Sequence, residues 1–512
     1  MKSVLNAIGE RNPQLFREFK GRLTWRNIAI ASVSSLAIQL LLLLCYLAFL
    51  PKEFAQENPY CLPKSSLKAP CVVDWVEWWF DVSRAMHWMV AIALIGGGVY
   101  LLISDLAREE RRGTLNFIRL SPQSTPSILT GKLLGVPVLL FLGAAIALPF
   151  HLWSAIAGNS PFTWFLSFYA LLAAYCLLFY SAAILYALIG GSQGWIGASG
   201  AIAVFAMLFQ LDYRVGFYTH TVVRQPWYGL PIGFHIFLFR GFISFTAILA
   251  TYWIWQALHR RFRNQNIQVF SKKQSYGLVA CIQLFLLGFM LDFLSESSLV
   301  YEGEYYLFAI FFANFWLFIC LIVLLSPPRQ TLQDWARYSK GVRRRFLWQD
   351  LLWGEKSPAA IAIAVNIAIT AAIFIPWISL WPVENFSKYS AIITIIFGSL
   401  LMLCYAMVTQ MFSLMHLKHA KLWGMATAIA ATALPLFAIE VLVAKSKQAS
   451  VLFLLTMMPF LGIEHASTIH VVLAFLSYVA LLASLSAKLN QQLNRLGEST
   501  TKALLRDSLS RN

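Results

Sequence analysis

Residue patterns that support catalysis are scarce in this chain of 512 residues. No zinc-binding His-Glu-x-x-His occurs, and no Gly-x-Ser-x-Gly nucleophile motif follows a strand-like run. The pair Glu109-Glu110 begins a Glu-Glu-x-x-x-Arg protease pattern, but Thr114 stands at the arginine position. Lys132 follows a glycine as in an ATP-binding P-loop, but the first glycine and the following Ser or Thr are lacking. We therefore expect no enzyme activity, and no cofactor or metal site, in this chain.

The composition of the chain places most of it in a lipid bilayer. Hydrophobic residues make up 59%, charged residues 12%, and the mean hydropathy is +0.65, whereas soluble domains carry about 25% charged residues. Such a chain is expected to be an all-α, polytopic protein of the cell (inner) membrane. About 20 apolar residues cross the hydrocarbon, and twelve runs of roughly this length are found at 27–50, 87–104, 133–153, 163–189, 195–211, 236–257, 276–294, 305–326, 359–381, 389–415, 423–444 and 466–487.

Charged residues predict which side of the membrane each loop faces. With the N-terminus in the cytoplasm, the inside segments hold 30 Lys and Arg against 10 Asp and Glu. The outside segments then hold 9 Lys and Arg against 13 Asp and Glu. This asymmetry follows the positive-inside rule and accounts for the net charge of +17 without a nucleic-acid partner. Both termini are therefore predicted to be cytoplasmic.

Two of the seven cysteines, Cys61 and Cys71, lie in the longest loop predicted outside, 51–86. The other five fall in apolar runs, where a thiol usually behaves as a small hydrophobic group. Because the outer side is oxidising, we predict a disulfide between Cys61 and Cys71.

A basic stretch at 259–274 divides the twelve runs into six and six. We therefore predict two six-helix bundles, one formed by residues 1–263 and the other by residues 264–512. Internal repeats of this kind are common in transporters, where a pathway lies at the interface between the halves. The run at 451–461 is too short to span the membrane, and it predicts a re-entrant segment in the second half.

Arg240 and His470 occupy the same position, the fifth residue, in the last predicted span of each half. A basic residue at such a place has two interpretations. Its side chain extends to the outer interface, or it contacts an anionic headgroup or a substrate along a pathway. Both interpretations stay open at the level of the sequence.

The first long cytoplasmic connection, 105–132, has the most distinctive local pattern. Gly113 is a natural helix stop, and residues 114–120 then predict a short amphipathic helix that ends before Pro122. This helix is expected to lie across the cytoplasmic ends of two spans, with its apolar side chains exposed until a partner covers them. The side chains available to that face are Leu115, Phe117 and Ile118.

This connection resembles the one between the second and third spans in permease subunits of type 2 ABC exporters. The shared pattern is an acidic residue before Gly-Thr-Leu, then a proline, and then Ile-Leu-x-Gly-Lys. The resemblance implies a coupling helix that docks on a separate ATPase subunit. The residues that it implies for coupling are Glu109, Glu110, Gly113, Thr114, Leu115, Ile118, Pro122 and Lys132.

The N-terminal segment extends the resemblance. Asn12 and Pro13 open an amphipathic helix that is similar to the family's elbow helix, which lies in the headgroup plane. The first half thus resembles a complete permease domain. The corresponding connection of the second half, 327–358, has neither Gly-Thr-Leu nor Gly-Lys, so the second half is expected to be a diverged permease domain.

These observations predict the permease component of an ATP-driven ABC exporter. Its expected partners are separate ABC ATPase subunits and membrane lipid, in a homodimer or a hetero-oligomer. The alternative is a gradient-driven transporter or channel of the same topology, and the third option is an intramembrane enzyme. Gradient-driven transporters usually carry carboxylates deep in their spans. Here Asp292 and Glu440 lie near the outer ends of their predicted spans, which favours energy from ATP.

Overall fold

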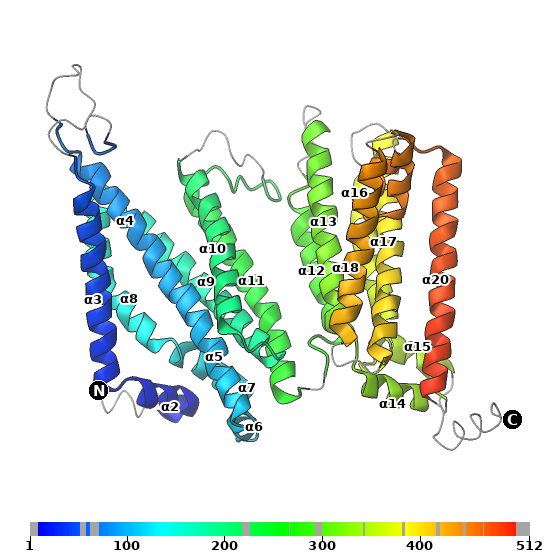
Figure 1. Ribbon diagram of the computed structural model, residues 1–512, viewed down its shortest axis with the longest axis horizontal. Coiled ribbons are helices and arrows are strands. Elements are labelled where there is room, and N and C mark those ends of the chain that lie inside the picture. The colour runs from blue at the N-terminus through cyan, green and yellow to red at the C-terminus, as the bar shows by residue number, and fades with distance from the viewer. Residues whose placement is uncertain are drawn as a thin grey trace. The chain divides into compact units, whose positions relative to one another are not determined.

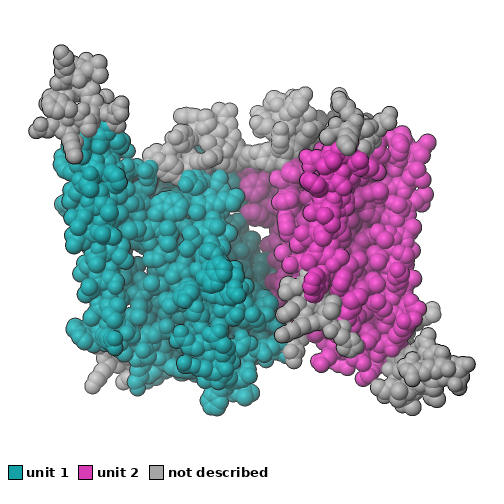
Figure 2. All heavy atoms as spheres, in the orientation of Figure 1, with its two compact units in different colours: residues 1–225, 231–265 teal, residues 226–230, 266–512 magenta. Residues whose placement is uncertain are grey.

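The computed structural model is built from helices (Figure 1). Two isolated β-bridges accompany them in the described part of the chain, so the all-α prediction is confirmed. The chain folds as two compact units, residues 1–225 with 231–265 and residues 226–230 with 266–512 (Figure 2). The structure describes residues 9–51, 58–61, 71–217, 226–265, 267–291, 300–340, 344–380, 385–415, 420–443, 447–463 and 465–497.

Eleven helices among the described residues are long and apolar enough to cross a membrane. The chain is therefore a multi-pass membrane protein. The sequence predicts about twelve spans, and the difference lies at 276–294. There, α12 (Lys272–Leu287) has 16 residues, which at 1.5 Å per residue is about 24 Å, less than the ~30 Å of hydrocarbon. The orientation of the spans stays a prediction.

Unit 1 combines long helices with several short ones. Its largest cluster of buried side chains includes Met86, Ile95, Leu102, Tyr180 and Phe205, which come from the central long helices of this unit. The helices of unit 1 are α2 (Pro13–Arg22), α3 (Trp25–Ala48), α4 (Trp75–Ile92), η1 (Ala93–Gly97), α5 (Gly98–Arg111), α6 (Thr114–Arg119), α7 (Thr125–Gly135), α8 (Val138–Ala157), α9 (Phe162–Leu188), α10 (Gly194–Phe217) and α11 (Ile236–Arg263).

A π-helical turn, η1, joins α4 and α5 into one helix of 37 residues. The Tyr180 hydroxyl donates a hydrogen bond of 2.7 Å to the carbonyl of Leu94 inside this turn. Gly98 makes the approach of Tyr180 feasible, because a Cβ atom at this position would lie 2.3 Å from the tyrosine hydroxyl oxygen. The π-helical turn is thus held by the hydrogen bond from Tyr180, and glycine at position 98 leaves room for that side chain.

Unit 2 holds five of the eleven candidate spans. The run at 451–461 forms two short elements instead of one helix: a 3₁₀ segment followed by the five-residue α19. The 3₁₀ segment contacts α18, and α19 contacts α17. The predicted re-entrant course stays a prediction. The helices of unit 2 are α12, α13 (Val300–Leu325), α14 (Arg329–Ser339), α15 (Arg344–Trp353), α16 (Ala360–Ser379), α17 (Asn385–Leu414), α18 (Ala420–Val443), η4 (Lys447–Leu455), α19 (Pro459–Ile463) and α20 (Thr468–Leu496).

Candidate functional site

Lys132 of α7 lies at the centre of a buried cluster of charges in unit 1. Its Nζ atom is 2.7 Å from Glu18 Oε1, 2.8 Å from Asp105 Oδ2 and 2.6 Å from Glu109 Oε1. The ammonium group donates hydrogen bonds to Asp105 and Glu109 and forms an ion pair with Glu18. We call these four residues the Lys132 cluster. It joins α2, α5 and α7, and the connection that the sequence singled out runs from α5 to α7.

The charges of the cluster explain why a lysine belongs there. Burial alone disfavours the ammonium ion, but the three nearby carboxylates outweigh it and raise the pKa of Lys132. Carboxylate oxygens of Glu18, Asp105 and Glu109 lie within 4.8 Å of one another, a spacing that suits a metal ion. In this structure the Lys132 ammonium supplies the positive charge that such an ion would bring.

Helix α2 reaches the cluster because α7 presents small residues to it. A Cβ atom on Gly131 would lie 2.8 Å from the backbone nitrogen of Leu15, so only glycine permits this approach. Asn12 caps α2 by accepting from the Leu15 N–H, and its amide donates to the carbonyl of Ser127 at 2.9 Å. The buried residues of α2 are polar, Gln14 and Glu18. Its apolar residues are left only partly covered by protein, as expected for a helix at a membrane interface.

Helix α6 follows α5 after a turn at Gly113, whose φ of +73° favours glycine. The expectation that Leu115 and Ile118 are exposed is wrong. They are only 3% and 6% exposed and belong to the main hydrophobic cluster. The physical reason is that residues three apart share a helix face, and this short helix covers one end of the core with that face. Phe117, expected on the same face, is 81% exposed, and Leu120 is 85% exposed.

The remaining residues implied for coupling lie around this helix without forming one site. Glu110, Thr114 and Pro122 are exposed. The Thr114 hydroxyl donates to the backbone carbonyl of Glu109 at 3.2 Å. Of the implied residues, the structure therefore brings Glu109 and Lys132 into direct contact and leaves these three at the surface.

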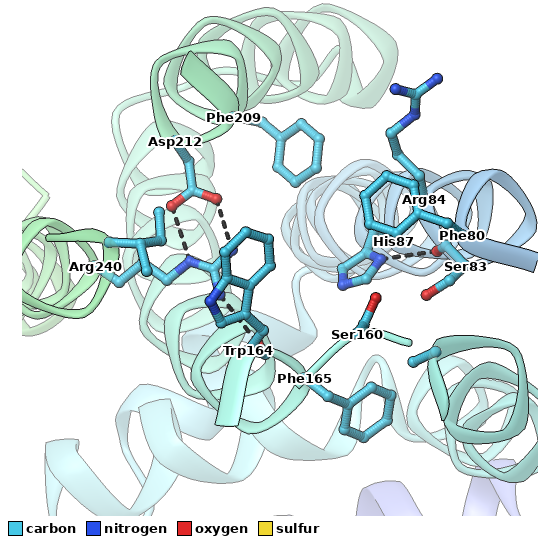
Figure 3. Close-up of a pocket in the computed structure, with 12 residues that line it drawn as sticks. Phe80, Ser83, Arg84, His87, Ser160, Trp164, Phe165, Phe209, Asp212 and Arg240 are labelled. Carbon is cyan, nitrogen blue, oxygen red and sulfur yellow. Dashed lines mark hydrogen bonds and ion pairs between the residues drawn. The ribbon is translucent and has the colours of Figure 1, made fainter. Parts of the chain in front are cut away.

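A second polar site lies among α4, α9, α10 and α11 (Figure 3). The Arg240 guanidinium makes two hydrogen bonds of 2.9 Å to the carboxylate of Asp212. It also donates to the Ser167 hydroxyl at 2.6 Å and to the carbonyl of Trp164 at 3.0 Å. Arg240 is 8% exposed, so its side chain is held among the helices of unit 1. Its partner Asp212 directly follows the predicted fifth span and was not singled out from the sequence.

His87 faces the same pocket and contacts a second histidine, His151. The His87 Nδ1 atom lies 2.8 Å from the Ser83 carbonyl oxygen and 3.2 Å from His151 Nε2. Because a carbonyl only accepts, Nδ1 carries the proton in the neutral ring, and Nε2 is the basic nitrogen. The other ring nitrogen of His151 lies 2.9 Å from the Tyr169 hydroxyl. These contacts join residues distant in sequence, so no local sequence signal marked His151 or Tyr169.

The size of this pocket limits what it can hold. Its volume is about 60 Å³, which accommodates a few water molecules and is far below the roughly 300–1,000 Å³ of sites for organic ligands. The Ser83 hydroxyl lines it and is buried without a hydrogen-bond partner, and Figure 3 draws Ser83 and His87 around the same space. The arrangement suits water molecules and proton exchange with His87 more than a large cargo.

The other residues predicted from the sequence lie elsewhere. His470 is the third residue of α20 and accepts from the backbone N–H of Ser467 at 3.2 Å in a capping box. Its environment therefore differs from that of Arg240. Cys61 and Cys71 are joined in a disulfide, with Cα atoms 5.5 Å apart, shortly before α4 begins.

No protein-family model, no curated protein and no solved structure matches this chain. The class that the fold defines is that of multi-pass, all-α membrane proteins.

Proposed function

We propose that the chain is the membrane-spanning permease component of an ATP-driven exporter, and that a separate ABC ATPase subunit docks on α6. The observation that carries this proposal is the exposure of Phe117 and Leu120, at 81% and 85%, on a helix whose opposite face is buried. Neither residue lies in a candidate span. Large apolar side chains that are exposed outside the bilayer are typical of protein interaction sites.

The length of the preceding helix supports access by a soluble partner. The helix from Trp75 to Arg111 has 37 residues and is about 55 Å long, whereas the hydrocarbon is about 30 Å thick. Part of this helix must therefore extend beyond the hydrocarbon even when it is tilted. The charged residues Arg108 to Arg111 stand at its C-terminal end, so we infer that this end protrudes and that α6, which follows it, is reached from the aqueous phase.

The attachments of α6 support a coupling role. Leu115 and Ile118 fix it to the core of unit 1, and the Lys132 cluster ties the adjoining helices α5 and α7 to α2. A force applied at Phe117 would act on this whole group of helices. Interdigitated side chains and buried ion pairs transmit displacement because they resist compression and separation.

Charged substitutions at the exposed positions test the proposal. The variant carrying Phe117→Asp and Leu120→Asp should keep the thermal stability of the detergent-purified protein, because neither side chain is buried. It should lose the P-loop subunit that co-purifies from native membranes, detected by photolabelling with azido-ATP, since each buried aliphatic or aromatic side chain contributes roughly 1.5 to 3 kcal/mol.

Two matched variants complete this test. Leu115→Asp should lower the stability of the protein alone, because it places a carboxylate in the core. Trp348→Asp changes an aromatic residue of α15 that is 64% exposed, and it should leave the ATPase bound. An ATP-binding subunit retained by the Phe117 and Leu120 variant, or none found with the unmodified chain, would contradict the proposal.

A second function, proton-coupled transport, is favoured by the histidine pocket. Asp212, Arg240, His87 and His151 are titratable or charged groups inside the helix bundle of unit 1, and such groups are typical of proton pathways. Purified protein in vesicles with an imposed pH gradient and no ATP would then conduct protons, and His87→Gln would abolish this flux. Absence of any flux would leave the ATP-driven proposal as the better supported one.

A further inference from the structure

An apolar groove of about 360 Å³ lies between α3, α4 and α8 in unit 1. The groove exists because many of its lining positions hold the small residues alanine, serine and glycine. On α3 the lining residues recur every three or four positions, so they form one face of that helix. This face runs from Asn27 through Ile30, Ala31, Ser34, Ser35 and Ile38 to Gln39.

Three polar side chains that line the groove, Asn27, Ser35 and Gln39, have partners within the protein. The Ser35 hydroxyl donates to the carbonyl of Gly143 at 2.8 Å. The Gln39 amide donates to the backbone and hydroxyl oxygens of Ser35, at 3.2 and 3.1 Å. The Asn27 amide donates to the carbonyl of Arg22 at 2.9 Å. With these donors engaged inside the protein, the groove favours a ligand that is itself apolar.

The groove opens sideways and has the length of one leaflet. Ile30 and Ile38 line it and remain 55% and 51% exposed. The groove is therefore open at the outer surface of α3, a candidate span, where lipid would contact the protein. Asn27 and Gln39 are twelve residues apart, which is about 18 Å along a helix, and half of the ~30 Å hydrocarbon is about 15 Å. A single extended hydrocarbon chain of one leaflet matches this length.

One end of the groove is basic. Asn27 lies two residues after Trp25, which is 83% exposed, as expected for an aromatic residue at the headgroup level. Two basic residues just before Asn27 are also exposed, Lys20 on α2 and Arg26 at the start of α3. Basic side chains next to the membrane surface attract anionic lipids.

We infer that this groove binds one acyl chain of an anionic phospholipid, with the phosphate of its headgroup at Lys20 and Arg26. The inference goes beyond the proposed function and does not depend on it, because no ATP and no ATPase subunit enters the argument. Two observations select this occupant: an apolar groove of one-leaflet length and a basic surface at its end.

Photolabelling of the full-length protein in vesicles tests the inference. The probe is phosphatidylglycerol with a diazirine on one acyl chain, and adducts are mapped by mass spectrometry of peptides. We expect adducts on residues 27–39 of α3 and 139–147 of α8 in clear excess over α20, whose exposed face reports ordinary contact with bulk lipid. Equal labelling of α3, α8 and α20 would overturn the inference.

Filling the groove provides the matched comparison. Ala31→Phe and Ala144→Phe each place a ring in the groove, and either one should remove the excess labelling. Ala37→Phe adds the same ring to an exposed position of α3 that does not line the groove, and it should leave labelling unchanged. Thermal unfolding identifies any misfolded variant. If one of the two filling variants misfolds, the other still tests the inference. Excess labelling that survives in a folded variant with a filled groove would contradict the inference.

The headgroup is tested with the same acyl chains on phosphatidylcholine. Phosphatidylglycerol should label the groove at least about fivefold more strongly, because each Lys or Arg contact with an anionic lipid contributes about 1 kcal/mol. Replacing Lys20 and Arg26 with Gln should abolish this preference while leaving adducts of both lipids in the groove. Equal labelling by the two lipids in the unmodified protein would overturn the assignment of an anionic headgroup.

Discussion

Each unit has a long connection that is attached to its bundle through one buried lysine, but the two lysines have different partners. In unit 1, Lys132 contacts three carboxylates. In unit 2, Lys272 donates to the carbonyls of Leu351 and Pro358 and to the Ser357 hydroxyl, at 2.6, 3.1 and 2.6 Å. Both lysines are 2% exposed, so burial alone does not distinguish them.

The difference in partners sets the difference in charge chemistry. Three carboxylates overcome the cost of burial and raise the pKa of Lys132. Neutral acceptors cannot do this, so burial lowers the pKa of Lys272 to about 8, although Asp350 opposes the shift. Unit 1 therefore holds its connection with an ion-paired lysine whose pKa is raised, and unit 2 holds its connection with a lysine whose pKa is lowered to about 8.

The largest effect is expected from Lys132→Met. It leaves Glu18, Asp105 and Glu109 close together without their shared cation, and breaking a buried ion pair in this way costs about 3–5 kcal/mol. Thermal unfolding in detergent measures the loss. Adding Glu109→Gln should recover part of it, because one of the unpaired charges is removed. A loss no larger than that of Lys272→Met would break the contrast between the two lysines.

Gly131→Ala tests whether the close packing of α2 on α7 is a second attachment of the connection in unit 1. The added Cβ atom would meet the backbone of Leu15 at 2.8 Å, and overpacking of this kind costs about 1–3 kcal/mol. We expect α2 to become more susceptible to proteolysis. Gly143→Ala is the matched control, because its Cβ atom would meet Ser35 at an ordinary 3.9 Å. Equal behaviour of the two variants would show that α2 is not held by close packing.

Lys272→Met should destabilise the protein less than Lys132→Met does. It removes a donor to two carbonyls and a hydroxyl but leaves no cluster of unpaired charges, and unsatisfied acceptors cost about 1–3 kcal/mol. Thermal unfolding of the two methionine variants under the same conditions provides the comparison. A larger loss for Lys272→Met would mean that neutral acceptors hold a connection more firmly than carboxylates do.

The smallest expected effect is a rise in the protein's stability with pH that Lys272 produces and Lys132 does not. Its pKa is about 8 in the folded chain and about 10.4 in an unfolded one, so the unfolded state binds more protons between these values. Stability should therefore rise by about 1 kcal/mol between pH 7 and 9 through this group. The raised pKa of Lys132 predicts the opposite trend, a loss of stability above about pH 10.4. Lys272→Met should remove the first trend, and an unchanged pH profile in that variant would refute it.

The sequence predicted the membrane spans well because hydrocarbon thickness fixes the length of an apolar run. The predicted run 163–189 corresponds to α9, and the run 236–257 begins where α11 begins. The short α12 departed from this rule because its apolar pattern continues beyond the end of the helix at Leu287. Hydropathy measures composition, and it does not locate the residue at which a helix ends.

The candidate sites were only partly predictable, since they depend on contacts between distant residues. Lys132 was singled out, but its partner Glu18 lies on a helix more than a hundred residues earlier. Arg240 was singled out without Asp212, which lies 28 residues away in the chain. In α6 the pattern of apolar residues fitted burial of either face, so the sequence could not determine whether Leu115 or Phe117 is covered.

The π turn at Ala93–Gly97 has a consequence for insertions and deletions. Its backbone hydrogen bonds enclose one residue more than those of an α-helix, so this turn accommodates an extra residue while the helix on either side keeps its facing direction. Removing one residue there would leave a regular helix in which Asp105 and Glu109 still face Lys132. Removing one residue within α5 would instead rotate the two carboxylates by about 100°. Related chains are therefore expected to differ in length at this turn and to keep a constant length from Gly98 to Glu109.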